Sequence, residues 1–186
     1  WVFAEVLQDH LGLTAEAVSW SYTVKARGKK PRQLSLDGRI PLDQISDAVA
    51  KQRVGKWLDA ACADIGLPNP TRQNLQGSVF EVRQGYKSKD SKRQNADVAN
   101  ASNAYAHQYL PVVVLLSSQI DGDVAERYQR ARWLLLRGTT KGSSFDSAYV
   151  FTKQVVGYDL AAFFQRNSAV LKERIEGVLQ KLLSED

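Results

Sequence analysis

The chain has 186 residues, of which 44% are hydrophobic and 24% are charged. These fractions are ordinary for a globular protein, so they exclude wholesale disorder and a collagen-like repeat. The longest apolar run, Leu110 to Leu116, is much shorter than the roughly 18 residues that a membrane span requires, so we expect no membrane partner. The net charge of +5 favours anionic partners over cationic ones.

Cysteine and histidine are scarce, with one cysteine, Cys62, and two histidines. A single cysteine excludes an internal disulfide and a cysteine-rich zinc site. Because no secretory signal is visible, we expect a reducing compartment, with the cytoplasm as the default. The sequence lacks methionine and begins at Trp1, so we expect a longer gene product.

Hydrophobic periodicity predicts helices and strands along the whole chain. The predicted helices are 2–18 with a break near Gly12, 41–65, 97–109, 122–137, 159–164 and 170–183. The predicted strands are 19–25, 34–40, 78–89 with a bulge at Gly85, 111–117 and 147–155. This order predicts an α/β fold with a mixed central sheet flanked by helices.

The connection between two of these strands fixes their relative direction. A helix over 97–109 would cross from strand 78–89 to strand 111–117, which predicts a parallel pair with a right-handed crossover. Strand 111–117 is apolar throughout, as is typical of a strand covered on both faces. We interpret 1–186 as one domain, in which residues 1–40 are a candidate peripheral element of helix and hairpin.

Two clusters of basic residues concentrate the positive charge. The first surrounds the predicted turn 27–32 and includes Lys29 and Lys30. The second lies directly after the predicted strand 78–89 and extends to Arg93. Each cluster is also compatible with a plain solvated loop. The neighbouring residues therefore have to show whether a cluster binds an anionic partner.

The stretch from Phe80 to Asp97 is the most informative part of the sequence. Alternate side chains of a strand share a face, so Glu81 and Arg83 are predicted on one face, with Phe80 and Val82 pointing into the core on the other. Charged groups on a half-buried strand are costly unless they meet a partner or a charged ligand. The sequence therefore predicts a binding site on this strand.

A divalent metal and a phosphate are the partners that suit these residues. The Glu81 carboxylate offers the hard oxygen ligands that Mg²⁺ prefers. Lys87 and Lys89 share its face if the bulge at Gly85 leaves the alternation intact, and a lysine there would place a water and stabilise developing charge. Asp97, at the start of the next helix, would add a second carboxylate, although it would equally complement the helix dipole.

A polar string precedes that helix. Its side chains could contact DNA phosphates or base edges together with free helix N–H groups. Gln94 and Asn95 would also serve simply as helix caps. The residues assigned to this contact are Lys92, Arg93, Gln94 and Asn95.

The region from 78 to 117 resembles the metal-dependent PD-(D/E)xK nucleases, and most closely the type II restriction endonucleases. Glu81-Val82-Arg83 is similar to their acid-x-lysine element, with arginine in place of lysine. Lys87-Ser88-Lys89, followed by the polar string and Asp97, resembles a variant that carries its second acid on the following helix. The first acid of the signature has no match between Gly66 and Phe80, and Asp64 is the nearest candidate.

The resemblance implies a restriction-endonuclease-like core and a homodimeric, magnesium-dependent endonuclease that acts on duplex DNA. Its catalytic residues would be Glu81, Arg83, Lys87 and Lys89, with the metal on Glu81 and Asp97. Two alternatives stay open. The chain could bind nucleic acid without cutting it, or it could be a partner-binding domain of a larger assembly whose basic loops face an acidic protein.

Overall fold

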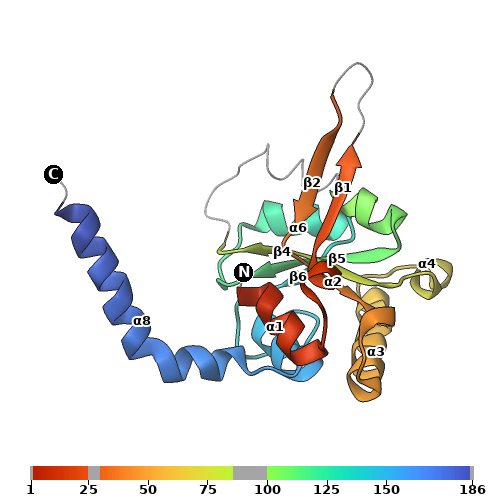
Figure 1. Cartoon of the computed structure of the whole chain (residues 1–186). Helices are drawn as coiled ribbons and strands as arrows, with labels where there is room; N and C mark the ends of the chain where they lie inside the picture. The colour runs from red at the N-terminus through yellow and green to blue at the C-terminus, as the bar shows by residue number, and fades with distance from the viewer. Residues whose placement is uncertain (1, 25–29, 86–99, 185–186) are drawn as a thin grey trace.

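The computed structural model describes residues 2–24, 30–85 and 100–184 (Figure 1). Residues 100–106 are also helical. The named elements, in chain order, are α1 (Val2–Leu11), α2 (Ala15–Val18), β1 (Trp20–Val24), β2 (Arg32–Leu36), β3 (Gly38–Pro41), η1 (Leu42–Gln44), α3 (Ala48–Asp64), α4 (Asn69–Gln73), β4 (Gly77–Arg83), β5 (Tyr109–Leu115), α6 (Gly122–Arg130), β6 (Leu134–Leu136), α7 (Ala148–Phe151), η2 (Thr152–Val156) and α8 (Leu160–Leu183).

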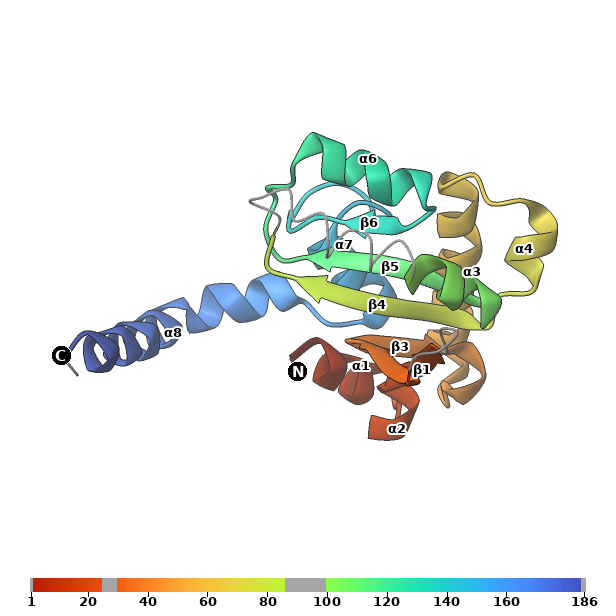
Figure 2. The same ribbon diagram turned by 90° about the horizontal axis from the view of Figure 1, so that it is seen from above.

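The central sheet has the strand order β3-β4-β5-β6. Strand β3 runs antiparallel to β4, whereas β4, β5 and β6 are parallel to one another (Figure 2). This confirms the predicted mixed α/β architecture and the parallel pairing of the strands that contain Glu81 and Val113, which lie opposite each other. The carboxyl ends of three neighbouring strands therefore lie at one edge of the sheet.

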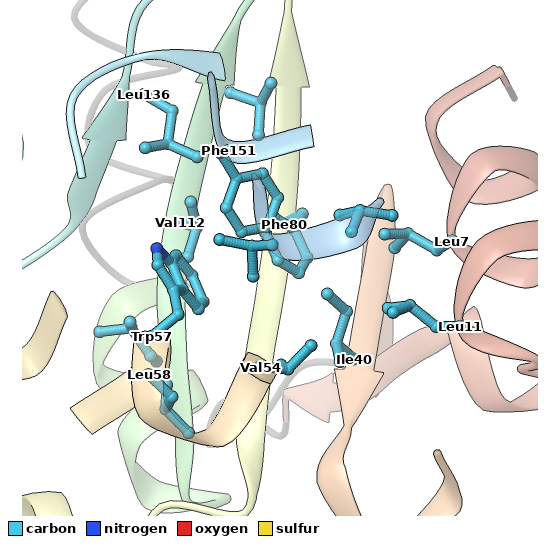
Figure 3. Packing of buried hydrophobic residues seen from close by; sticks show 14 of the residues in the cluster. Leu7, Leu11, Ile40, Val54, Trp57, Leu58, Phe80, Val112, Leu136 and Phe151 are labelled. Carbon is cyan, nitrogen blue, oxygen red and sulfur yellow. The ribbon is translucent and has the colours of Figure 1, made fainter. Parts of the chain in front are cut away.

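Buried side chains cover both faces of this sheet. On one face, Phe80 and Val112 contact a cluster that includes Trp57 of α3, Leu7 of α1 and Phe151 of α7 (Figure 3). On the other face, the cluster is formed by alternate strand residues together with side chains from β1, helical residues 101 and 104, and α6. Since both faces are covered, each parallel strand is an apolar run, as predicted for strand 111–117.

Strands β1 and β2 form an antiparallel hairpin in which Trp20 lies opposite Leu36 (Figure 1). Trp20, Tyr22 and Leu36 are buried at its base, so Trp20 serves packing. The predicted strand 34–40 is two strands, because the chain leaves β2 at Asp37 and then joins the central sheet as β3.

The prediction of a helix over 122–137 is wrong beyond Arg130. Helix α6 ends there, and Arg132 adopts a left-handed conformation with a φ of 59°, which breaks the helix. The apolar residues Leu134–Leu136 then form β6, whose side chains are all buried beside β5. A short buried strand and a continuing helix face present the same apolar run to a sequence analysis.

The prediction of a strand over 147–155 is also wrong. These residues form α7 and the π-helical turn η2. Ser147 caps α7, because its hydroxyl accepts a hydrogen bond from the Val150 N–H at 3.1 Å. Phe151, Thr152, Val155 and Val156 are buried at helical spacing, not at the alternating spacing of a strand.

Further boundaries differ from the prediction. The predicted helix 41–65 begins only at Ala48, after Pro41 has ended β3, and the predicted strand 78–89 ends at Arg83, before Gly85. The described part of the predicted helix 97–109 ends at residue 106, and Tyr109 already begins β5. The two predicted helices at the end of the chain are one helix, α8, of 24 residues. No helix in the described ranges is both long enough and apolar enough to cross a membrane.

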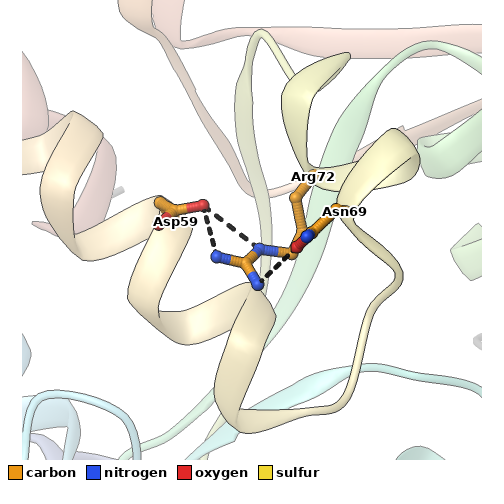
Figure 4. A network of polar contacts seen from close by, with 3 residues as sticks. All are labelled: Asp59, Asn69 and Arg72. Carbon is orange, nitrogen blue, oxygen red and sulfur yellow. Dashed lines mark hydrogen bonds and ion pairs between the residues drawn. The ribbon is translucent and has the colours of Figure 1, made fainter.

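The segment between α3 and β4 is fixed by a polar network (Figure 4). Arg72 of α4 donates to Asp59 of α3 at 2.7 and 3.1 Å and to Asn69 at 3.0 Å. The Asp59 side chain is 67% exposed, so water screens this ion pair. The network orients α4 on α3, and β4 follows directly.

Candidate active site

The end of β4 approaches the loop that follows β5. The Leu116 N–H donates to the Arg83 carbonyl at 2.9 Å, and the Gly138 N–H donates to the Ser117 carbonyl at 3.1 Å. A Cβ atom at Gly85 would lie only 3.2 Å from the Ser117 Cβ, so a side chain at this position would crowd the loop after β5. Ligands of open α/β sheets bind at this carboxyl edge.

Glu81 lies on β4 near this edge and is only 7% exposed. Its Oε1 atom is 2.6 Å from Nη2 of Arg83. The predicted alternation is confirmed, since Phe80 lies in the cluster on the opposite face and Val82 contacts that cluster. The face that carries Glu81 is itself buried, however, because Val79 on that face is fully inaccessible.

A buried carboxylate needs a counter-charge, and Arg83 supplies one. Removing an ionised carboxylate from water is costly unless the group is paired and hydrogen-bonded. The Arg83 side chain is 25% exposed, so it joins the buried carboxylate to the surface at the edge of the sheet. The pair thus exposes its positive group at the edge of the sheet, while the carboxylate behind it is buried.

Asp37 is a second carboxylate beside β4 that the sequence analysis missed. Its Oδ2 atom accepts a hydrogen bond from the Val82 N–H at 2.8 Å, and its own N–H donates to the Phe80 carbonyl at 2.8 Å. Asp37 therefore contacts the backbone on both sides of Glu81, from the neighbouring strand connection. The Asp37-Gly38 pair is a turn signal that could have divided the predicted strand 34–40.

Asp64 lies at the other edge of the sheet. It is the exposed last residue of α3. The carbonyls that follow it, of Ile65 and Gly66, each accept from Nη1 of Arg132 at 2.6 Å, just before β6 begins. The structure therefore does not bring Asp64 to Glu81, and Asp37 is the acid that lies upstream of β4 and beside it.

Most of the predicted DNA contacts lie outside the described residues. Lys30 is described and is exposed before β2, on the arm formed by the hairpin. The assignments outside the described ranges stay predictions: Lys29, Lys87, Lys89, Lys92, Arg93, Gln94, Asn95 and Asp97.

A hollow of about 390 Å³ opens beside the acid–arginine pair. Asp37, Arg83 and Gln84 form its polar side. Its other walls are largely apolar and include Leu116 and Phe164. Asp37 and Arg83 therefore border an open space, whereas Glu81 is not among its lining residues.

The described acids suit a magnesium ion that is shared with a phosphate. Mg²⁺ commonly binds through one or two carboxylates plus substrate phosphates and water. Asp37 and Glu81 offer two carboxylates, and Arg83 balances Glu81 without the metal. Within the described ranges, no three His, Cys, Asp or Glu residues form a metal-binding group. Asp37 and Glu81 are therefore the described acids beside β4 that could serve as oxygen ligands.

Two other titratable groups lie in the packed body and have shifted pKa values. Burial raises the pKa of the Cys62 thiol to about 12, so the thiol stays protonated at neutral pH. Burial also raises the pKa of Tyr105, whose hydroxyl donates to the Arg132 carbonyl at 2.6 Å. Neither group is a nucleophile or a base near neutral pH.

No protein-family model, curated protein or solved structure matches the chain. The resemblance to nucleases therefore rests on the residues of the chain itself. Of these residues, the structure describes Glu81 and Arg83.

Proposed function

We propose that the chain is a magnesium-dependent endonuclease that cleaves duplex DNA, with a restriction-endonuclease-like core. The observation that carries the proposal is the buried Glu81 carboxylate paired with Arg83 at the carboxyl edge of parallel strands. Buried ionised groups with a specific charge partner cluster at functional sites. The basic stretch that starts at Lys87 follows β4 directly, which supports an anionic substrate.

In this proposal, Glu81 and Asp37 hold the metal, with Asp97 as a further acid. The bound Mg²⁺ supplies polarisation of the scissile phosphate and a more acidic water. Arg83 is the counter-charge of Glu81, and its planar guanidinium would suit a phosphate. Lys87 or Lys89 orients the attacking water.

In the proposed complex, the DNA backbone lies along the basic residues. Lys92, Arg93, Gln94 and Asn95 contact phosphates or base edges, and Lys29 and Lys30 contact further phosphates. A homodimer would match a palindromic site, since a two-fold axis relates both the protein and the sequence. We place the enzyme in the cytoplasm, as a type II restriction endonuclease.

A second candidate is a nucleic-acid-binding module that does not cut. It is favoured by the ion pair itself, because Arg83 stands where the signature has lysine and already engages Glu81. The two candidates predict the same DNA binding and differ in cleavage.

Cleavage of supercoiled plasmid DNA separates them. The wild-type protein is expected to nick or linearise the plasmid with magnesium and to leave it intact with EDTA. Glu81→Gln should lower the rate at least about a hundredfold, the scale of losing one charged group of an active site. Asp64→Asn is the matched control, because it removes an acid at the other edge of the sheet and should cut normally. A wild-type protein that binds DNA and does not cut it supports the second candidate.

A further inference from the structure

A second hollow lies at the other end of the central strands, beside the base of the hairpin. Its volume of about 470 Å³ is within the range of small-molecule sites, roughly 300–1,000 Å³. Tyr109, the first residue of β5, forms part of its wall, whereas the candidate active site lies where β4 ends. The lining also includes Glu16, Ser19, Trp20, Arg39 and His107.

Neutral groups hold the guanidinium of Arg39 in place. Its Nε donates to the Ala17 carbonyl at 2.7 Å, and its Nη2 donates to the Glu16 carbonyl at 3.2 Å. Its Cζ lies 5.9 Å from the centre of the Tyr109 ring, within the range of a cation–π contact. These contacts fix the guanidinium plane before a ligand binds, so that little side-chain entropy is lost on binding.

Arg39 lacks an acidic partner in the part of the chain that the structure describes. No ion pair there joins its guanidinium to a carboxylate, although the side chain is partly buried. A charge that has lost part of its water is costly unless an opposite charge compensates it. An anionic group of a ligand would supply that charge, and a planar guanidinium suits a phosphate or a carboxylate.

His107 adds an exposed aromatic ring to the hollow. The ring packs edge-on against Trp20, with 5.9 Å between the two ring centroids. Its Nδ1 lies 2.8 Å from the Asn103 carbonyl, and because a carbonyl only accepts, Nδ1 is the donor. In the neutral ring Nε2 is then an acceptor. Exposed rings and guanidinium planes are the surfaces on which nucleobases stack in proteins.

The Glu16 carboxylate selects among anionic ligands. It is exposed at the rim of the hollow, where it would repel a simple anion. A ligand that also carries N–H or O–H donors would instead donate to it. A nucleotide combines all of these features: a phosphate for Arg39, a planar base for the His107 ring, and amino or hydroxyl groups for Glu16.

We propose that the second hollow binds a nucleotide, with Arg39 on the phosphate, His107 against the base and Glu16 on a donor group of the base or sugar. A free nucleotide and the end of a nucleic-acid strand share this chemistry. The proposal goes beyond the nuclease activity and does not depend on it. Its test contains no magnesium and measures no cleavage, so the two proposals fail separately.

The first test is calorimetric titration of the whole chain with adenosine 5′-monophosphate in magnesium-free buffer. This nucleotide should bind at least about tenfold more tightly than adenosine or inorganic phosphate, the scale of one hydrogen bond to a charged group. A nucleotide that binds no more tightly than inorganic phosphate overturns the proposal. A 5′-phosphorylated dinucleotide is the further arm, and tighter binding of the dinucleotide identifies a strand end as the source.

The second test locates the ligand with two variants. His107→Ala removes an exposed ring, and Arg39→Lys keeps the charge but removes the planar fork. Each should weaken binding of adenosine 5′-monophosphate at least about tenfold, with unchanged circular dichroism. Arg72→Lys is the matched control, because Arg72 pairs with Asp59 outside the hollow and should bind as the wild type does. Unchanged affinity in both His107→Ala and Arg39→Lys overturns the proposal.

Discussion

The sheet and helix α8 use apolar residues in opposite ways. In the sheet, Phe80, Val112 and Leu134 are almost completely buried by helices of the same chain. In α8, Ile175 and Leu182 are more than half exposed. The difference teaches that the described part of the chain covers the apolar residues of the sheet, whereas it leaves those of α8 exposed. Folding stability should therefore depend on the sheet far more than on α8.

The largest expected effect is on the stability of the sheet. Phe80→Ala should lower the free energy of unfolding by about 3–5 kcal/mol, because it leaves a cavity in a fully buried cluster. Leu182→Ala, measured on protein dilute enough to be monomeric, should change it by no more than about 0.5 kcal/mol. Denaturant titration gives both values, and equal losses would contradict the comparison.

A smaller loss is expected when the counter-charge of Glu81 is removed. Arg83→Ala should cost about 1–3 kcal/mol of stability, the range for leaving a buried polar group unsatisfied. Arg72→Ala is the matched control, and should cost at most about 1 kcal/mol because its partner Asp59 is exposed.

The effect of magnesium on the Arg83→Ala variant tests whether a metal binds Glu81. Mg²⁺ binding should restore stability to Arg83→Ala more than it stabilises the wild type, since the ion then supplies the missing positive charge. Thermal unfolding with and without magnesium measures the difference. An equal response of the two proteins would speak against a metal on Glu81.

DNA affinity should depend on the basic residues after β4 and not on those of α8. Neutralising Lys92 and Arg93 together should flatten the dependence of log affinity on log salt by roughly 1–2 units, at about 0.9 per phosphate contact. Neutralising Arg174 and Lys181 removes the same charge from α8 and should leave the slope unchanged. Fluorescence anisotropy over a salt series measures the slope for both variants. A slope that flattens only when Arg174 and Lys181 are neutralised would indicate that DNA binds α8.

The smallest effect concerns the junction between the body and α8. Asp159 caps α8, accepting from the Ala162 N–H at 2.9 Å. Hydrogen bonds from Lys153 and from this N–H lower the pKa of Asp159 below its usual value of 3.8. The stabilisation from its charge is present above that value and is lost as the pH falls through the lowered pKa. Asp159→Asn keeps a capping oxygen, so its deficit relative to the wild type should be slight at pH 7 and absent in strong acid.

The sequence predicted the parallel β4–β5 pair because an apolar run and a connecting helix leave one simple topology. It misassigned Leu134–Leu136, since a buried strand of three residues has no period of its own. It divided α8 near Ser168, because polar residues interrupt the apolar pattern there while the helix continues. The hydrophobic pattern along the chain thus predicted the central pair β4–β5 better than β6 or α8.

The site was predicted in part for a related reason. Glu81 and Arg83 lie two apart on one strand, so alternation alone brings them together. Asp37 lies more than forty residues upstream and contacts the backbone of Phe80 and Val82 through the pairing of β3 with β4, which a search near β4 does not reveal. Contacts between distant segments depend on register, and register was not readable from the sequence.

A crystal soaked in Mn²⁺ tests the central claim most directly, because anomalous scattering locates the ion without requiring cleavage. The proposal predicts an ion coordinated by an oxygen of Glu81, with Asp37 as the adjacent acid and Arg83 moved away from its 2.6 Å contact. A crystal in which Mn²⁺ occupies other sites while Arg83 still engages Glu81 would contradict the magnesium-dependent mechanism.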